Sequence, residues 1–466
     1  MKSFLSPPSH RELLPDEKTD DTYRQLRWQV FVGIFIGYAA YYLVRKNFSL
    51  AFPLLLEMGF DKSEIGFAFS FNATAYGMSK FLSGGLSDRS DARKFLPLGL
   101  VLASTATILA GTAFGMSHVA WMAVFQFLVG WFGGMGWPPC GRVMTHWFSV
   151  RERGTKMSFW NVAHNVGGGL VGLVAGWGVT FALSLGLSKE LSHQAGIFWM
   201  PATIAILTAL IAYLLIRDTP QSCGLPSIEA YKNDYPPHYD KNSEKVLKTK
   251  DIFFKYVLNN KLLWIVALAN AFVYFIRYGV LDWAPTYLSE VKGYDIKEVG
   301  FAYFIYEWAA IPGTVLCGWV SDRLFKGKRA MTTIIFMALV MAAVFVYWKN
   351  ADNKLIDSIA LVAIGFLIYG PVMLIGVQAL DLSPKNAAGT SAGFTGFFGY
   401  FFGTSILANI VLGKVVQSLG WDFGFGLLIV SCLVAILLMT LMHQREKASQ
   451  NLRAARNSPR PSPAET

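Results

Sequence analysis

The stretch Gly37-Tyr38-Ala39-Ala40-Tyr41-Tyr42-Leu43-Val44-Arg45-Lys46-Asn47 places an arginine inside a long apolar run that begins near Val30. The chain repeats this arrangement in its second half, at Phe272-Val273-Tyr274-Phe275-Ile276-Arg277, again within an apolar run. A charged side chain at the centre of a membrane-spanning helix costs about 2.5–3.5 kcal/mol on insertion scales, so it is rarely retained without a partner or a ligand. Two arginines in corresponding apolar runs therefore need a common explanation.

The match between the two arginine-bearing regions continues downstream at a nearly constant offset along the chain. Gly59–Ala68 reappears as Gly293–Ala302, and Ser87-Asp88-Arg89 reappears as Ser321-Asp322-Arg323. We infer that the chain contains two copies of one membrane unit, each contributing an arginine at a corresponding place.

The composition is that of a polytopic membrane protein. Of the 466 residues, 53% are hydrophobic and 15% are charged, whereas about 25% of residues are charged in soluble proteins. The segment 1–28 is polar and no small-residue cleavage site follows the first apolar run, so we expect no signal peptide. We expect neither a metal site nor a disulfide, because the cysteines lie singly in different segments; they are Cys140, Cys223, Cys317 and Cys432.

Twelve apolar segments have roughly the 18 to 30 residues that a helix needs to cross a hydrocarbon core about 30 Å thick. They are 29–54, 63–85, 95–115, 118–143, 157–183, 194–216, 262–289, 297–320, 330–348, 355–381, 388–413 and 420–442. The expected fold is an all-α integral membrane protein with twelve transmembrane helices in two six-helix halves. The expected divisions are a tail at 1–28, a half at 29–216, a linker at 217–261, a half at 262–442 and a disordered tail at 443–466.

Most lysines and arginines lie on one side of these predicted helices. The tails, the linker and the connections on their side hold 29 of the 41, whereas the opposite connections hold six. The positive-inside rule therefore places both termini and the linker in the cytoplasm. This topology accounts for most of the net charge of +11, so we expect a lipid bilayer around the protein and no nucleic-acid partner.

Aromatic and cationic side chains share a face of both arginine-bearing helices. Tyr38, Tyr42 and Arg45 occupy positions i, i+4 and i+7, and Tyr274 and Arg277 repeat the pattern at i and i+3. Equivalent helices of two halves related by an axis along the membrane normal face each other across a central cavity. Two facing guanidiniums repel in a low dielectric unless an anion lies between them. A phosphate monoester supplies a dianion whose oxygen pairs fit planar guanidinium forks.

The competing interpretation of each arginine is a structural ion pair, with Asp282 or Glu307 as the partner. Two further basic residues, Arg142 and Lys414, lie near segment ends, where we expect their side chains to reach the membrane interface.

The fifth segment carries Asn161 and His164 one turn apart on one face, beside the glycine run Gly167–Gly169 that lets a neighbouring helix come close. A histidine in a helix is commonly a satisfied core residue. This one lies in an intramembrane polar cluster and titrates near the second pKa of a phosphate monoester, which favours a ligand role. Lys80 has a threonine as its counterpart at position 314, and it either lends positive potential to the access path or pairs with an acid.

A charged loop follows the second segment and recurs in the second half. Gly84–Lys94 resembles the G-x-L-x-D-R-x-x-R-[RK] loop of the major facilitator superfamily, and Gly318–Arg329 is its second copy. An aspartate beside a cationic cluster at a helix end offers ion pairs that form in one conformation and part in another. The alternative is an ordinary positively charged cytoplasmic loop. The gating candidates are Asp88, Arg89, Asp322 and Arg323.

Five longer runs carry a resemblance to a known family. They are Tyr42–Asn47, Gly134–Arg142, Trp160–Gly169, Arg217–Pro226 and Gly365–Pro371. Together they resemble the organophosphate:phosphate antiporter family, and most of all its bacterial members that transport glycerol 3-phosphate. The resemblance extends from about Arg11 to Arg445. It implies a monomeric, cofactor-free carrier of the bacterial inner membrane. Inorganic phosphate leaves the cytoplasm in exchange for glycerol 3-phosphate, by rocker-switch alternating access.

The resemblance also implies roles for individual residues. The family's two phosphate-clamping arginines match Arg45 and Arg277, its substrate-binding histidine matches His164, and its cavity lysine matches Lys80. Its acids match Asp282 and Glu307, which the resemblance pairs with Lys46 or Arg277 when substrate is absent. Its cavity tyrosines match Tyr38, Tyr42, Tyr274, Tyr369 and Tyr400.

Three other functions remain as alternatives. A clamp that reads phosphate also suits exchange of hexose phosphate or phosphoglycerate, and some family relatives are membrane sensors that bind a sugar phosphate without net transport. An enzyme is not expected, because the sequence shows no nucleophile–base pair, metal cluster or nucleotide loop. The resemblance further implies that the phosphonate antibiotic fosfomycin enters by the same route.

Overall fold

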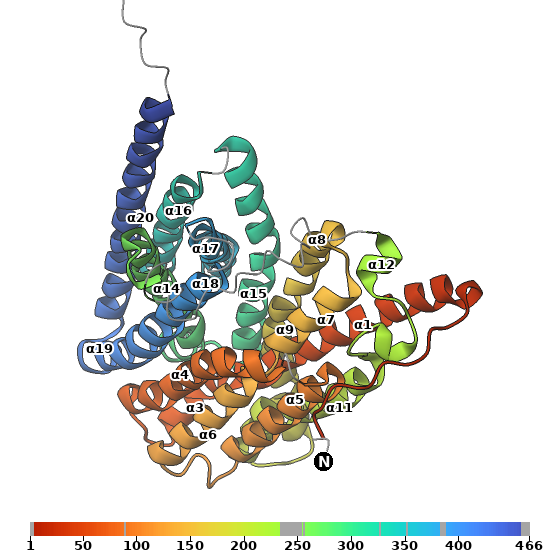
Figure 1. Ribbon diagram of the computed structural model, residues 1–466. Coiled ribbons are helices and arrows are strands. Elements are labelled where there is room, and N and C mark those ends of the chain that lie inside the picture. The colour runs from red at the N-terminus through yellow and green to blue at the C-terminus, as the bar shows by residue number, and fades with distance from the viewer. Residues whose placement is uncertain are drawn as a thin grey trace, which may run out of the picture.

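The computed structural model describes residues 4–87, 90–233, 254, 257–325, 328–350, 353–382 and 388–457. Every element in these ranges is helical (Figure 1). Ten helical stretches of the described chain are long and apolar enough to cross a membrane. Two predicted spans remain. The span 29–54 is covered by α1 (Asp16–Arg45) and the short helices that continue it to Glu57, and the span 63–85 is covered by α4 (Lys62–Ser87). The predicted all-α fold with twelve membrane passes is confirmed.

The N-terminal half begins with α1, its short continuations α2 (Asn47–Leu50) and α3 (Phe52–Glu57), and α4. Pro53 lies in the first turn of α3, where its missing N–H leaves no intrahelical bond unmade. The other passes of this half are α5 (Ala92–Ala110), α6 (Val119–Gly133) with α7 (Trp137–Trp147), α8 (Val150–Asn161) with α9 (Ala163–Ser184), and α10 (Lys189–Gln194) with η1 (Ala195–Trp199) and α11 (Met200–Leu215).

Two short helices, η2 (Gln221–Cys223) and α12 (Ile228–Lys232), follow α11. The C-terminal half starts at α14, where the Asn260 side chain accepts hydrogen bonds from the first free backbone amides of the helix. Its passes are α14 (Lys261–Glu290), α15 (Ile296–Trp319) with η4 (Val320–Leu324), α16 (Arg329–Lys349), α17 (Lys354–Asp381), α18 (Ala388–Phe397) with η6 (Phe398–Val411) and α19 (Leu412–Leu419), and α20 (Trp421–Asn457).

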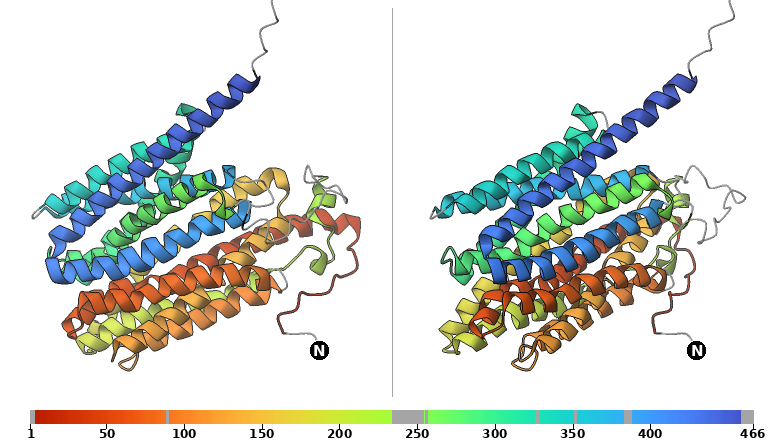
Figure 2. Two further views of the ribbon diagram at one scale, coloured as in Figure 1. Left: turned by 60° about the vertical axis from the view of Figure 1, so that its left-hand side comes forward. Right: turned by 90° about the vertical axis from the view of Figure 1, so that its left-hand side faces the viewer.

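The two halves form two bundles that lie against each other. Figure 2 shows the N-terminal half in red to yellow-green and the C-terminal half in green to blue, with α14 and η6 next to the first bundle. The start of α1, α12 and the end of α20 lie at one end of the molecule, which we call the tail end. The connection Glu57–Lys62 and the connection Glu290–Ile296 lie at the opposite end, which we call the far end.

Contacts between the halves gather toward the far end. Lys62 Nζ lies 2.7 Å from Glu290 Oε1, and Ser405 Oγ donates to the Ser70 carbonyl oxygen at 3.0 Å. Helices α9 and α15 cross so closely that a Cβ on Gly172 would lie 2.4 Å from the Gly300 carbonyl oxygen. Only glycine permits this backbone approach, so the far-end contact between the halves is tight.

Two helix ends differ from the sequence prediction. Helix α1 begins at Asp16, although residues 1–28 were expected to form a tail. Helix α20 continues to Asn457, past the expected start of the tail at residue 443, and residues 458–466 lie outside the described chain. The extension is rich in Ala, Lys, Glu, Gln and Arg, which are strong helix formers, and its first proline comes only at Pro459.

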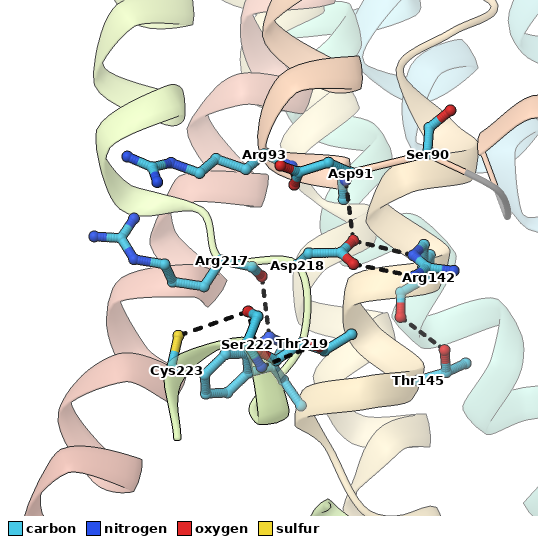
Figure 3. A network of polar contacts seen from close by, with 12 residues as sticks. Ser90, Asp91, Arg93, Arg142, Thr145, Arg217, Asp218, Thr219, Ser222 and Cys223 are labelled. Carbon is cyan, nitrogen blue, oxygen red and sulfur yellow. Dashed lines mark hydrogen bonds and ion pairs between the residues drawn. The ribbon is translucent and has the colours of Figure 1, made fainter. Parts of the chain in front are cut away.

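Arg142, which lies near a segment end, makes an ion pair with Asp218 at the tail end of the N-terminal half. Its Nε and Nη2 donate to the two carboxylate oxygens of Asp218, each at 3.0 Å (Figure 3). Asp218 also accepts from the Ala92 amide at 3.0 Å, and Trp147 Nε1 donates to the Arg217 carbonyl oxygen at 3.0 Å. This buried carboxylate therefore joins α5, α7 and the segment after α11, which stabilises the tail end of the N-terminal half.

Candidate functional site

Arg45 is the last residue of α1 and only 4% exposed. Its guanidinium carbon lies 3.5 Å from the centre of the Tyr76 ring, and the rings of Tyr42 and Tyr400 lie at 5.6 and 5.4 Å. Its Nη1 is buried and has no hydrogen-bond partner in the described part of the chain. The cation is thus held among aromatic faces with part of its donor capacity unused.

Arg277 has the same kind of surroundings in the other half. It lies on α14, is 5% exposed, and its guanidinium carbon is 4.0 Å from the Tyr369 ring and 4.8 Å from the Tyr278 ring. Its Nε is buried without a hydrogen-bond partner among the described residues. Neither this arginine nor Arg45 makes an ion pair within the described chain. A buried charge without a counterion is costly, so both guanidiniums favour binding of an anion.

Aromatic side chains from both halves connect the surroundings of the two arginines. The His164 ring lies 5.6 Å from the Tyr42 ring and 6.1 Å from the Tyr369 ring, between centroids. Tyr42 contacts the first arginine and Tyr369 the second. His164 therefore lies between the two cationic regions.

Tyr400 makes a second connection. Its ring centre is 5.0 Å from that of Tyr76 and 5.2 Å from that of Tyr274, which lies one turn before Arg277 on α14. Tyr400 thus contacts Arg45, at 5.4 Å from the guanidinium carbon to the ring centre, and the turn of α14 that carries Arg277. The structure thus brings together both arginines and the tyrosines predicted from sequence, although it leaves their role in binding a prediction.

The hydrogen bond of His164 defines its tautomer. Its Nδ1 donates to the backbone carbonyl oxygen of Asn161, because a carbonyl can only accept. Nε2 is then the nitrogen that can accept a hydrogen bond in the neutral ring. Asn161 itself is exposed, and the interaction that ties it to the histidine uses its backbone rather than its amide side chain.

Lys80 and Tyr38 lie at the edge of this group. The Lys80 ammonium lies 5.3 Å from the Trp137 ring and 6.0 Å from the Tyr76 ring, and it makes no ion pair with a described acid. Of the two roles considered for Lys80, the absence of an ion pair among the described residues favours a source of positive potential. The Tyr38 ring stacks on Trp160 at 4.6 Å and lies 5.6 Å from the Tyr42 ring, so it packs against the tyrosine that contacts Arg45.

The two buried acids have partners other than the arginines. Lys46 Nζ lies 2.7 Å from Asp282 Oδ1, with side chains 4% and 1% exposed, and this pair joins the two halves. Glu307 accepts from the Tyr369 hydroxyl at 2.6 Å and from Asn165 Nδ2 at 3.1 Å. The interpretation of the arginines as structural ion pairs is therefore wrong for this arrangement. The expected ion pair of Glu307 with a cation is likewise not seen among the described residues.

The gating candidates stay untested. Asp88 and Arg89 lie outside the described residues, and so does the side chain of Asp322. Arg323 lies in η4 at the tail end and is exposed. Their role remains a prediction.

Three residues of the site were not predicted. Tyr76 stacks on Arg45, Tyr278 lies 4.1 Å from the Lys46 ammonium, and Asn165 binds Glu307. The internal repeat gives no signal for Tyr76, because an alanine occupies position 310, its counterpart in the second half. A tyrosine four residues before a lysine is the only local hint.

A helical bundle of two repeated halves with buried cations between them is the architecture of a polytopic membrane transporter. The chain belongs to the Major Facilitator Superfamily, whose family model matches residues 34–408.

Within that superfamily the chain is similar to two proteins named glycerol-3-phosphate transporter. The one from Bacillus subtilis (strain 168) is 54% identical over 454 residues, which cover 97% of this chain and 100% of that protein. The one from Haemophilus influenzae is 52% identical over 458 residues, covering 93% and 94%. These relatives place the chain among transporters rather than enzymes.

A solved structure shares the fold. It is that of a bacterial homolog of the human lysosomal transporter Spinster, in an inward-facing and unoccupied conformation, with a TM-score of 0.68 and 15% identity. The alignment covers 90% of this chain and 96% of that chain.

Proposed function

We propose that the protein imports glycerol 3-phosphate in exchange for inorganic phosphate by alternating access. The observation that carries this proposal is the pair of buried guanidiniums, Arg45 and Arg277. One comes from each half, and both lack a counterion among the described residues. A phosphate dianion supplies the charge and the oxygen pairs that both lack. The names of the relatives that are 54% and 52% identical support glycerol 3-phosphate as the organic substrate.

The proposed site places the phosphoryl group between the two arginines. The Lys80 ammonium, 6.0 Å from the Tyr76 ring, adds positive potential. His164 Nε2 donates to the phosphoryl group when the ring is protonated, and accepts from a P–OH group when the ring is neutral. The other proposed contacts are Tyr38, Tyr42, Tyr274, Asn161, Tyr369 and Tyr400. Because both arginines belong to one chain, a monomer contains the complete site.

The charge distribution supports an orientation in which the tail end faces the cytoplasm of the bacterial inner membrane. Contacts between the halves gather at the far end. We therefore assign this arrangement to the state whose site opens to the cytoplasm. A ligand shifts a conformational equilibrium only through differential affinity for the two states. Phosphate bridging Arg45 and Arg277 removes their mutual repulsion and lowers the barrier to inversion. The empty carrier keeps two like charges apart and inverts slowly, which yields exchange rather than leak.

The test is exchange in proteoliposomes made with the purified full chain. Vesicles loaded with inorganic phosphate should take up labelled glycerol 3-phosphate, whereas vesicles loaded with sulfate should take up little. Hexose 6-phosphate, 3-phosphoglycerate and fosfomycin are added as competitors, and fosfomycin is expected to compete. Faster exchange of a hexose phosphate or phosphoglycerate would change the assigned substrate. Binding without any exchange would favour the sensor function instead.

A further inference from the structure

The tail end carries a cavity of about 560 Å³ that lies apart from the proposed transport site. Its walls come from three elements: α1, the start of α8, and α12. Helix α12 is held on α1 by Tyr231, whose ring stacks on Tyr23 at 4.0 Å, and by the Tyr23 hydroxyl, which donates to the Pro226 carbonyl oxygen at 3.1 Å. The cavity is therefore formed by packed elements.

One of the cations that line the cavity, Arg27, is neutralised by an acid of the same lining, Glu152. Arg27 makes an ion pair with Glu152, with side chains 16% and 31% exposed. Burial of Glu152 opposes its ionisation, but the hydrogen bonds from Arg27 and from the Ser149 amide outweigh this effect and hold the pKa of the carboxyl below its ordinary value. This pair stays ionised at neutral pH and contributes no net charge to the cavity. Asp20, the other acid of the lining, offsets one of the three cations that remain.

The remaining cations leave the cavity positively charged. Arg24 pairs with Asp21 only on the surface, where both side chains are 85% exposed and the interaction is weak. Lys156 and Lys232 make no ion pair with a described residue. Their ammonium groups lie 5.8 Å from the Phe31 ring and 5.1 Å from the Tyr231 ring.

The position of the cavity relative to the bilayer is given by its aromatic side. Trp28 is 65% exposed, stacks on Phe31 at 6.0 Å, and lies directly before the first predicted membrane span. An exposed tryptophan at the boundary of a membrane span marks the level of lipid headgroups. The cavity thus combines cations with aromatic side chains at the membrane boundary, since Lys156 lies beside Phe31 and Lys232 beside Tyr231. This combination suits a ligand that is both anionic and amphipathic.

We propose that this cavity binds the headgroup of an anionic glycerophospholipid, with the phosphodiester at Lys156 and Lys232 and the glycerol backbone against Trp28 and Phe31. A membrane lipid fits better than a soluble anion, because a soluble anion makes no use of an exposed tryptophan at the bilayer boundary. The inference does not depend on the transport substrate. The bound lipid would contact α1, α8 and α12 at the same time and would hold α12 against the N-terminal half.

The test compares two lipids with identical acyl chains. The delipidated full chain in detergent is titrated with dioleoyl-phosphatidylglycerol or dioleoyl-phosphatidylcholine, and singly bound lipid is quantified by native mass spectrometry. With about a fivefold contribution from each of two cations, we expect roughly 25-fold tighter binding of phosphatidylglycerol. The double substitution Lys156→Gln/Lys232→Gln should remove most of this preference.

The matched control is Lys18→Gln/Arg445→Gln, which removes two exposed tail-end cations outside the cavity and should keep the preference. Because the readout is a ratio of two lipids within one variant, it does not depend on the yield of folded protein. Equal affinities for the two lipids in the unsubstituted protein, or an unchanged preference in Lys156→Gln/Lys232→Gln, would overturn the proposal. So would binding of soluble glycerophosphoglycerol with the affinity of the lipid, if that binding is lost in Lys156→Gln/Lys232→Gln. That result would assign the cavity to a free anion.

Discussion

Replacing Asp282 with asparagine would leave the Lys46 ammonium buried without its counterion. The pair spans 2.7 Å and its side chains are 4% and 1% exposed. Removing one partner of a buried ion pair destabilises a protein by about 3–5 kcal/mol, because the other charge stays desolvated. Since Lys46 and Asp282 belong to different halves, the loss acts on the arrangement in which the halves meet at the far end. Asp282→Asn should therefore lower the thermal unfolding midpoint of the substrate-free protein by several degrees.

The matched control is Glu290→Gln, which breaks another ion pair between the halves. Its partner Lys62 is 13% exposed and Glu290 is 42% exposed, so we expect a loss of about 0–1 kcal/mol. The double variant Lys46→Met/Asp282→Leu should recover most of the lost stability, since apolar replacement of a buried pair is often neutral. The assay is thermal unfolding of purified full-length variants in one detergent. An unfolding midpoint of Asp282→Asn equal to that of the unsubstituted protein would refute the reasoning.

Three further substitutions test other parts of the account. Tyr369→Phe removes the hydroxyl that donates to Glu307 at 2.6 Å while keeping the ring, and should lower stability by about 1.5–3 kcal/mol in a thermal unfolding assay, since a buried hydrogen bond to a charged group contributes about that much. Gly172→Ala places a methyl group 2.4 Å from the Gly300 carbonyl oxygen, so it should separate the far-end contact and slow exchange severalfold without abolishing insertion. Asp218→Asn removes the charge held by a bidentate arginine, and should lower stability by about 3–5 kcal/mol in a thermal unfolding assay.

Each of these predictions has a control variant with the same kind of substitution. Tyr213→Phe alters an exposed tyrosine outside the site, Gly376→Ala adds a methyl group with no atom within 4 Å, and Asp16→Asn changes an exposed acid at the tail end. An unchanged unfolding midpoint in Tyr369→Phe or in Asp218→Asn, or wild-type exchange in Gly172→Ala, would each contradict the corresponding step.

The sequence was sufficient to predict the fold class and to predict that two arginines are buried at corresponding places in the two halves. Apolar length identifies membrane helices without tertiary information, and a guanidinium inside such a run stands out because burial is costly. The internal repeat then placed Arg45 and Arg277 at corresponding positions.

The partners of buried charges were harder to predict, because they depend on packing between helices distant in sequence. Asp282 and Glu307 were both candidates for the arginines. Only the packing of α14 against the end of α1 assigns Asp282 to Lys46, and only the packing of α15 against α17 assigns Glu307 to Tyr369. The ion pair between Arg142 and Asp218 was likewise not predicted, since the two residues lie 76 positions apart in the chain. The end of α20 followed helix propensity rather than apolar content, so the hydropathy boundary at residue 442 was too early.

The most direct test of the central claim is the equilibrium affinity of the purified protein for inorganic phosphate in Arg45→Lys, Arg277→Lys and the double variant. Lysine keeps the charge but loses the planar fork, and one charge-assisted hydrogen bond is worth about 1.5–3 kcal/mol. If one phosphate bridges both guanidiniums, each single substitution should weaken binding by roughly 10- to 150-fold. Phosphate affinity equal to that of the unsubstituted protein in either single variant would contradict the account.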